Sequence, residues 1–421
     1  MQITPIHHPL SATVRVPGSK SLTNRALLIS ALAKGTTRIT NALFSDDSRY
    51  FAKALRTLGF DVQLDEDQHE MIVTGLGGKI PATKAELFIG NAGTAARFLS
   101  AFLTLGNGEY ILDGEPRMRE RPIGDLIDAL NQLGVELEAT NNCPPVEIFA
   151  KGLPGGKTKV AGDISSQFLS ALLMVAPYAQ SEIEITLSTE LNSKPYVDMT
   201  IAVMREFGVE IQRDDYKCFA IHPASYSPLT NYRIESDASA ASYFFAAPAI
   251  CGGTVTVENI SRKSKQGDIA FLDVLKQMGC QIVEGDNFIS VERRSPDLRG
   301  VDIDMRDIPD TAQTLAAVAP FASSPTRIRG IASARLKETD RVSATCTELK
   351  RLGVQVEEHE DGMTIYPCTT FKPANVQTYN DHRMAMAFSL IGLRFDGVAI
   401  ENPLCVSKTF PNYFEVLETL R

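Results

Sequence analysis

The sequence predicts an α/β protein of two domains, in which copies of one folding unit place helices in the middle and mixed sheets outside. Three observations predict this architecture. The chain has 421 residues, which at about 150 residues per domain fits two or three domains. One sequence phrase recurs every 71 to 75 residues, and a helix of small apolar residues precedes it in each copy. We therefore expect six copies, three in each domain.

The recurring phrase is an amphipathic helix that ends in glycine and is followed by a short β-rich run. Glycine at this point supplies the left-handed conformation that ends a helix before a strand. A sixth glycine is due where the chain stops, so the sixth copy lacks its closing strands. The five glycines are Gly59, Gly134, Gly208, Gly279 and Gly353.

The amino terminus is expected to complete the last copy, because residues 2–16 are the one β-patterned segment left unassigned. This predicts a discontinuous domain of residues 1–18 and 236–421, and a continuous domain of residues 19–235.

The helix in the front half of each copy is apolar around its whole circumference, which is typical of helices inside a core. Amphipathic helices packed on one large sheet are the alternative architecture. The six segments are residues 26–33, 94–104, 168–176, 238–250, 312–322 and 384–393.

Polar residues open these buried helices and indicate anion binding. Helix starts carry unpaired N–H groups and the positive end of the dipole, worth about 0.3–1 kcal/mol and up to ~2 when partly buried. Micromolar affinity needs about 8 kcal/mol. Lysine and arginine must supply the rest, at roughly 1.5–3 kcal/mol for each charge-assisted hydrogen bond. We expect three helix starts from each domain to line one cleft.

Composition excludes several functions. The net charge of −9 gives no general attraction for nucleic acid. The seven cysteines are scattered without a C-x-x-C pair, no signal peptide opens the chain and no run of 18 apolar residues occurs, so we expect a cytoplasmic protein with no membrane association.

Motifs for metal, nucleotide or covalent serine chemistry are missing as well. The sequence has no H-E-x-x-H, G-x-S-x-G or G-x-G-x-x-G pattern, which predicts no metal site and no cofactor. The stretch from Gly18 to Arg25 is not a Walker loop, because Ser19 rather than glycine precedes Lys20. What remains is a group of carboxylates among cations, Asp310, Glu338 and Asp381, which suits proton transfer and phosphate departure.

Along its whole length the chain resembles the enolpyruvyl transferases. The resemblance implies a two-domain inside-out α/β barrel of six βαβαββ-type units, with the active site in the interdomain cleft. It also implies transfer of the enolpyruvyl group of phosphoenolpyruvate to the 5-hydroxyl of shikimate 3-phosphate, through a tetrahedral intermediate, and we expect a monomer. The matching segments are residues 18–25, 91–97, 117–122, 165–167, 193–196, 307–310, 336–341, 380–385 and Lys408.

The resemblance also implies binding residues for each substrate, with Tyr196 packing near the sugar ring. Those implied for phosphoenolpyruvate are Lys20, Asn91, Gly93, Arg121, Gln167, Arg341, Arg383 and Lys408. Those implied for shikimate 3-phosphate are Lys20, Ser21, Arg25, Ser165, Ser166, Gln167, Ser193, Asp310, Ser333 and Lys337.

For catalysis, we expect Asp310 to take the hydroxyl proton and Glu338 or Lys20 to protonate the methylene. Ser333 stands where the family often has asparagine, and Phe98 where proline is common. Gly93 leaves room beside phosphoenolpyruvate, which predicts sensitivity to the competitive inhibitor glyphosate.

Three alternatives stay open. A sister transferase acts on UDP-N-acetylglucosamine, but it has Lys-Asn in place of Lys20-Ser21 and a reactive cysteine that residues 114–122 lack. An RNA-end-processing protein of similar repeat fold needs a basic face. A non-catalytic anion-binding protein needs neither Asp310 nor Glu338.

Overall fold

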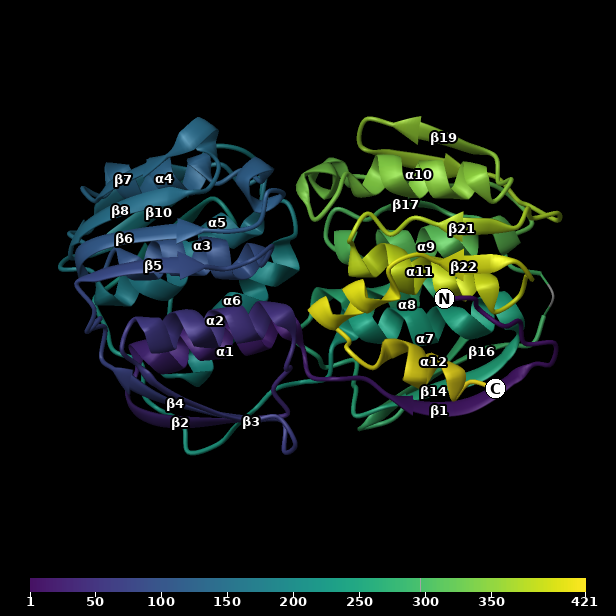
Figure 1. Ribbon diagram of the computed structural model, residues 1–421, viewed down its shortest axis with the longest axis horizontal. Helices are drawn as coiled ribbons and strands as arrows, with labels where there is room; N and C mark the ends of the chain where they lie inside the picture. Colours follow the sequence, from purple (N-terminus) through teal and green to yellow (C-terminus); the bar gives the residue numbers. More distant parts are fainter. Residues whose placement is uncertain (296) are drawn as a thin grey trace. The chain divides into compact units, whose positions relative to one another are not determined.

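The computed structural model describes residues 1–295 and 297–421. The chain divides into two compact units: unit 1 is Met1–Pro17 with Glu235–Arg421, and unit 2 is Gly18–Ile234. Over the described residues, the strands form five sheets of four strands and one sheet of two. Each unit has three of these sheets, and Figure 1 labels many of their strands.

Unit 2 contains three repeats, each with a buried helix, an outer helix and a four-stranded sheet (purple to teal in Figure 1). The first comprises α1 Lys20–Leu32, β2 Lys34–Thr40, α2 Asp46–Thr57, β3 Asp61–Asp65 and β4 Glu70–Leu76. The second comprises β5 Lys84–Phe88, α3 Gly93–Leu103, β6 Asn107–Asp113, α4 Gly124–Gln132, β7 Glu136–Ala139 and β8 Val146–Lys151. The third comprises β9 Gly156–Val160, α5 Ser166–Val175, β10 Ile183–Leu187, α6 Lys194–Glu206, β11 Gln212–Asp214, β12 Cys218–Ile221 and, beyond it, β13 Tyr232–Arg233.

Unit 1 follows the same plan, with its last repeat cut short. It begins with β1 Leu10–Arg15 and continues with α7 Ala238–Cys251, β14 Gly253–Glu258, α8 Phe271–Met278, β15 Gln281–Glu284 and β16 Phe288–Arg293. The fifth repeat comprises β17 Asp302–Asp304, α9 Ala312–Val318, β18 Thr326–Arg329, the short helix η7 Ala332–Leu336, α10 Arg341–Arg351, β19 Val356–His359 and β20 Gly362–Ile365. The sixth comprises β21 Ala374–Val376, α11 His382–Gly392, β22 Val398–Ile400, the short helix η8 Pro403–Lys408 and α12 Tyr413–Glu418.

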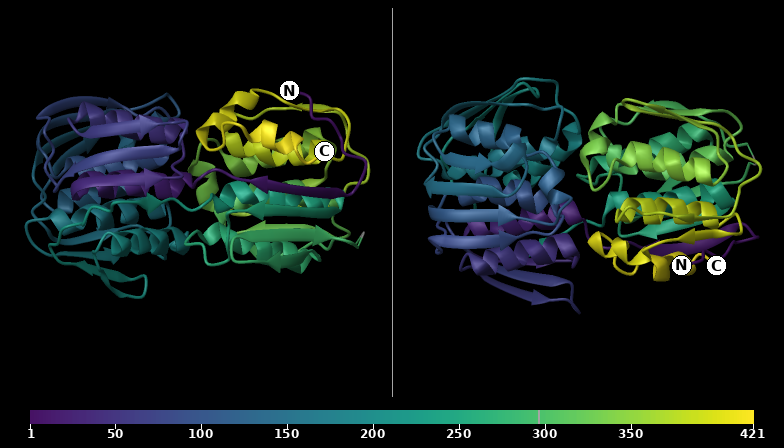
Figure 2. Two further views of the ribbon diagram at one scale, coloured as in Figure 1. Left: turned by 90° about the horizontal axis from the view of Figure 1, so that it is seen from below. Right: turned by 45° about the horizontal axis from the view of Figure 1, so that its top comes forward.

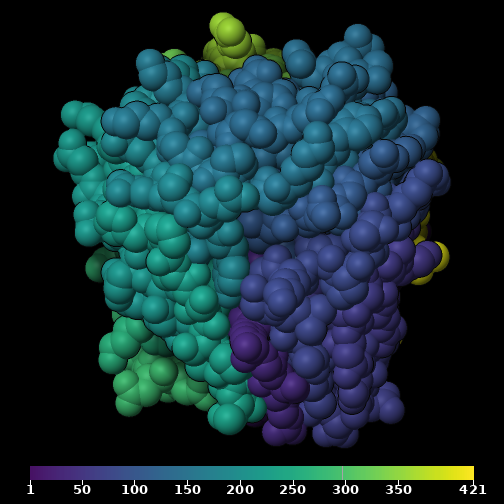
Figure 3. Space-filling model, turned by 90° about the vertical axis from the view of Figure 1, so that its left-hand side faces the viewer, coloured from purple at the N-terminus to yellow at the C-terminus, as the bar shows by residue number. Residues whose placement is uncertain are grey.

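Each unit encloses its apolar helices, as the repeat pattern predicts. In unit 2, α1, α3 and α5 contact one another, and in unit 1 α7, α9 and α11 do so. Every residue of α3 and of α11 is buried. Figure 2 shows the strands outside these helices in both units, and in Figure 3 the three repeats of unit 2 occupy three sectors of one face. Because such helices have no polar side to offer water, the sheets must cover them.

The amino-terminal segment serves two repeats, which partly corrects the expectation that residues 2–16 complete the last one. Gln2 forms an antiparallel bridge with Ala399 of β22, in the position of a closing strand. Strand β1 instead pairs in parallel with β14 of the fourth repeat.

Strands β1 and β13 exchange places. Strand β1 precedes α1 of unit 2 but pairs with β14 of unit 1, and strand β13 precedes α7 of unit 1 but pairs in parallel with β2 of unit 2. Elsewhere the strand before a buried helix pairs with the strand after it, as β5 does with β6. Strand pairing is set by tertiary contacts, so the local β pattern of residues 2–16 did not reveal this exchange.

The five repeat glycines adopt the expected left-handed conformation, with φ between 84° and 110°. At Gly134 (φ 86°) an added Cβ would lie 3.5 Å from Pro154 Cγ, which is ordinary contact, so conformation alone demands glycine there. At Gly75 an added Cβ would lie 2.0 Å from the carbonyl oxygen of Ser30 on α1.

These two glycines make a matched stability test. We expect Gly134→Ala to lower the free energy of unfolding by about 1–2 kcal/mol, the cost of a left-handed L-residue. Gly75→Ala should cost more, because backbone on α1 must move. Urea unfolding of both variants measures this, and equal losses would contradict the assignment.

Candidate active site

Arg25 lies at the centre of a buried polar network at the start of α1 in unit 2. Its guanidinium donates to Thr200 Oγ1 (2.7 Å), the Ser21 carbonyl (2.9 Å) and the Tyr196 carbonyl (3.1 Å), and more weakly to Ser170 Oγ (3.5 Å). It is 1% exposed, and burial lowers its pKa to about 10. This residue therefore ties α1 to α5 and α6, and orders the backbone at two predicted substrate residues, Ser21 and Tyr196.

Gly93 and Arg121 form a second contact in unit 2. Arg121 Nη1 donates to both the carbonyl and the side-chain oxygen of Asn91, each at 3.0 Å. A Cβ on Gly93 would lie 2.5 Å from Arg121 Nη2. Arg97 donates to the Gly93 carbonyl (3.3 Å) and to the Pro122 carbonyl (2.5 Å). It therefore links the first turn of α3 to the loop of residues 117–122. Three of the predicted residues are thus brought together.

The remaining predicted residues of unit 2 lie at helix starts. Lys20 is the first residue of α1, and its ammonium lies 3.7 Å from the carboxylate of Asp47, which is 2% exposed. Ser165 caps α5 by accepting from the Gln167 N–H (3.3 Å), and Ser166 begins that helix. Ser193 precedes α6 in a left-handed conformation (φ 58°).

Arg341 organises the predicted residues of unit 1. Its guanidinium contacts three carboxylates: Glu338 (2.7 Å), Asp381 (2.7 Å) and Asp310 (3.1 Å). Burial by itself lowers the pKa of Arg341, but the negative charges of Asp381, Glu338 and Asp310 outweigh it, so the pKa is raised. The arginine stays charged, and holds all three acids at one point.

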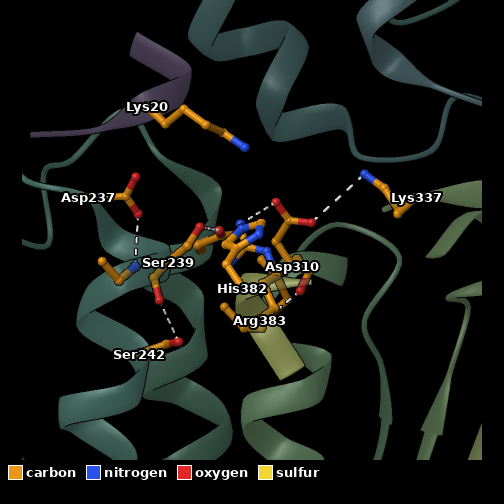
Figure 4. Close-up of polar contacts among 12 residues, drawn as sticks. Lys20, Asp237, Ser239, Ser242, Asp310, Lys337, His382 and Arg383 are labelled. Carbon is orange, nitrogen blue, oxygen red and sulfur yellow. Dashed lines mark hydrogen bonds and ion pairs between the residues drawn. The ribbon is translucent and has the colours of Figure 1, made fainter. Parts of the chain in front are cut away.

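Further cations surround the same acids. Arg383, at the start of α11, donates to Asp310 Oδ2 at 2.6 Å, and Lys337 lies 3.8 Å from Asp310 Oδ1. Lys408 lies 3.7 Å from Glu338 Oε1. Figure 4 shows Asp310 with Lys337 and Arg383. Four cations thus meet three carboxylates, and anionic ligands would compete with Asp310 and Glu338 for them.

Ser333 alone of the unit 1 predictions lies apart from these ion pairs. It is half-buried within η7, on the segment that leads to Lys337.

Two further acids hold the site together: Asp381, which the sequence analysis named only as a carboxylate among cations, and Asp268, which it did not name. Asp381 caps α11 by accepting from the Arg383 N–H (2.9 Å), which joins Arg383 and Arg341 to one carboxylate. Asp268 is 3% exposed and accepts a bond from Ser239 of α7. Burial, reinforced by the negative charge of Asp310, raises the pKa of Asp268 to about 6. The acidic residue at 381 was visible in the sequence, but nothing local marked Asp268.

Among the residues that the structure describes, no group of three or more His, Cys, Asp or Glu side chains could hold a metal ion. None of the described helices is long and apolar enough to cross a membrane.

Comparisons with known proteins identify the family. The family model described as EPSP synthase (3-phosphoshikimate 1-carboxyvinyltransferase) matches residues 5–417. A 3-phosphoshikimate 1-carboxyvinyltransferase of Trichormus variabilis is 49% identical over 98% of this chain and 97% of that protein. A 3-phosphoshikimate 1-carboxyvinyltransferase of Shewanella denitrificans is 51% identical over 96% of this chain and 95% of that protein.

A solved EPSP synthase from Acinetobacter baumannii is similar in structure, with a TM-score of 0.81 and 26% identity over 99% of this chain and 97% of that one. The inside-out α/β architecture is therefore shared with that enzyme. The chain belongs to the EPSP synthase (3-phosphoshikimate 1-carboxyvinyltransferase) family.

Proposed function

We propose that this chain transfers the enolpyruvyl group of phosphoenolpyruvate to the 5-hydroxyl of shikimate 3-phosphate and releases phosphate. Its family makes it a transferase of the shikimate pathway, which leads to chorismate and the aromatic amino acids. The observation that carries the proposal is the Arg341 cluster, where anion-binding cations touch carboxylates able to move protons.

Both units contribute to substrate binding in this proposal. Arg121, Arg341, Arg383 and Lys408 hold the phosphate and carboxylate of phosphoenolpyruvate, together with Lys20, Asn91, Gly93 and Gln167. The serines at the starts of α5 and α6, with Lys337, hold shikimate 3-phosphate. The contacts within each unit support this division, because they order these side chains before any ligand binds.

Two carboxylates, Asp310 and Glu338, carry out the proton transfers in this proposal. The 5-hydroxyl oxygen bonds to the substituted carbon of the enol, its proton passes to Asp310, and the methylene gains a proton from Glu338, with Lys20 as the alternative donor. The tetrahedral intermediate then loses a methyl proton and phosphate to give the new enol ether. Asp310 is paired with three cations, which weakens it as a base. Anionic substrates that draw those cations away make it a stronger base.

We also propose that the chain acts as a monomer in the cytoplasm. The seven cysteines support this compartment, since all of them are free thiols.

Phosphate release from phosphoenolpyruvate tests the function. We expect release with shikimate 3-phosphate present, and none with UDP-N-acetylglucosamine or without an acceptor. Release with the nucleotide sugar would support the sister transferase instead. The absence of release with either acceptor would favour a non-catalytic anion-binding protein or an RNA-end-processing protein.

Replacing the proposed base should separate catalysis from binding. We expect Asp310→Ala to lower kcat by about 10²–10⁴-fold, the usual contribution of a positioned acid or base. Both substrates should still bind by calorimetry, because the four cations remain. Asp310→Asn, which keeps the shape and removes only the negative charge, should show a similar loss. Near-normal turnover in either variant would refute the role.

Gly93→Ala tests the space beside Arg121. The new methyl would lie 2.5 Å from Arg121 Nη2, so the guanidinium must shift. We expect a higher KM for phosphoenolpyruvate and weaker inhibition by glyphosate, which competes for the same place. Gly134→Ala is the control, since it lies outside the proposed site and should keep both constants. Unchanged inhibition in Gly93→Ala would contradict the proposed placement.

A further inference from the structure

A buried tyrosine supports Arg383 from the side of α7. The side chain of Tyr243 is fully buried, and its hydroxyl oxygen accepts a hydrogen bond from Arg383 Nη1 at 3.4 Å. Arg383 is itself 4% exposed, so its partners within the protein determine where the guanidinium lies. Arg383 also donates a shorter hydrogen bond, from Nη2 to Asp310 Oδ2, at 2.6 Å.

The ring of Tyr243 is held in place by aromatic packing. It meets the ring of Tyr413 edge to face, with centroids 5.7 Å apart and planes at 75°. The Tyr413 hydroxyl is itself bonded to Ser389 Oγ (2.9 Å) and to the carbonyl of Met386 (3.0 Å), both on α11. Because Tyr243 is fully buried and its ring packs on the ring of Tyr413, its hydroxyl stays beside the guanidinium of Arg383, in the first turn of α11.

The two supports of Arg383 differ chemically. Asp310 changes its charge when it takes the hydroxyl proton, and its ion pair with Arg383 weakens at that moment. Tyr243 keeps its proton throughout, because burial raises its pKa to about 12. One support therefore varies during the reaction and the other stays constant.

We propose that Tyr243 is a positioning residue that keeps the guanidinium of Arg383 oriented toward phosphoenolpyruvate, both before Asp310 changes its protonation state and while it does so. This inference rests on the proposed function. It gives α7, through the fully buried side chain of Tyr243, a part in binding one of the two substrates.

Tyr243→Phe tests the inference, because it removes the hydroxyl and keeps the ring. We expect the KM for phosphoenolpyruvate to rise about tenfold. This is near the lower end of what the loss of a hydrogen bond to a charged group costs, because the bond from Arg383 to Tyr243 is long, at 3.4 Å. The KM for shikimate 3-phosphate should stay within twofold and kcat within threefold. A support that is equally strong before and during the reaction acts on KM and leaves kcat unchanged.

Tyr413→Phe is the matched control. It removes a hydroxyl from the same aromatic cluster without touching Arg383, so the KM for phosphoenolpyruvate should stay within twofold. Thermal unfolding of both variants measures any general loss of stability. A merely structural role would lower the Tm of Tyr243→Phe and raise both KM values together, as it would in Tyr413→Phe.

The inference is wrong if Tyr243→Phe keeps a normal KM for phosphoenolpyruvate, or if the two variants change alike. These outcomes presuppose an active wild-type protein. If the wild-type protein releases no phosphate with shikimate 3-phosphate, the proposed function fails first, and the inference fails with it.

Discussion

Helices that are apolar on every side must be enclosed, and the rest of this structure depends on that constraint. In each unit three such helices contact one another and the sheets lie outside them. Their first turns carry N–H groups that need partners. Lys20, Gly93, Ser166 and Arg383 all stand in first turns of buried helices. The polar site is thus a consequence of how the core is closed.

The charges of unit 1 show a second constraint. Arg341 is 3% exposed and touches three carboxylates, so each of them compensates part of a buried positive charge. With four cations against three acids, the group is close to neutral before any substrate arrives. In the function that we propose, anionic substrates bind by exchanging partners with Asp310 and Glu338, without rebuilding the cluster.

Strand β1 pairs within unit 1 and strand β13 within unit 2, although each lies next to the point where the chain passes into the other unit. Unit 2 is continuous, so all of its strands are made before residues 235–421. Strand β1 is made first, but its partner β14 follows only after the whole of unit 2. Such a distant pairing is slow to form because a long loop must close first. We expect the fourth sheet to be completed late in folding.

The sequence alone determined the repeat, the six buried helices and the left-handed glycines, because periodicity and helix-ending signals are local properties of the chain. It also identified the family, through ordered motifs that span nearly the whole length. Only the tertiary structure decided which strands pair, since pairing depends on residues far apart, as in β1 with β14.

The same holds for the arginines of one loop. Arg117 pairs with Glu120 and Arg119 with Asp113, whereas Arg121 binds Asn91. Neighbouring arginines look alike in a sequence, and long-range contacts determine which partner each of them binds. The support of Arg383 by Tyr243 is equally invisible there, because 140 residues separate the two and only packing brings them together.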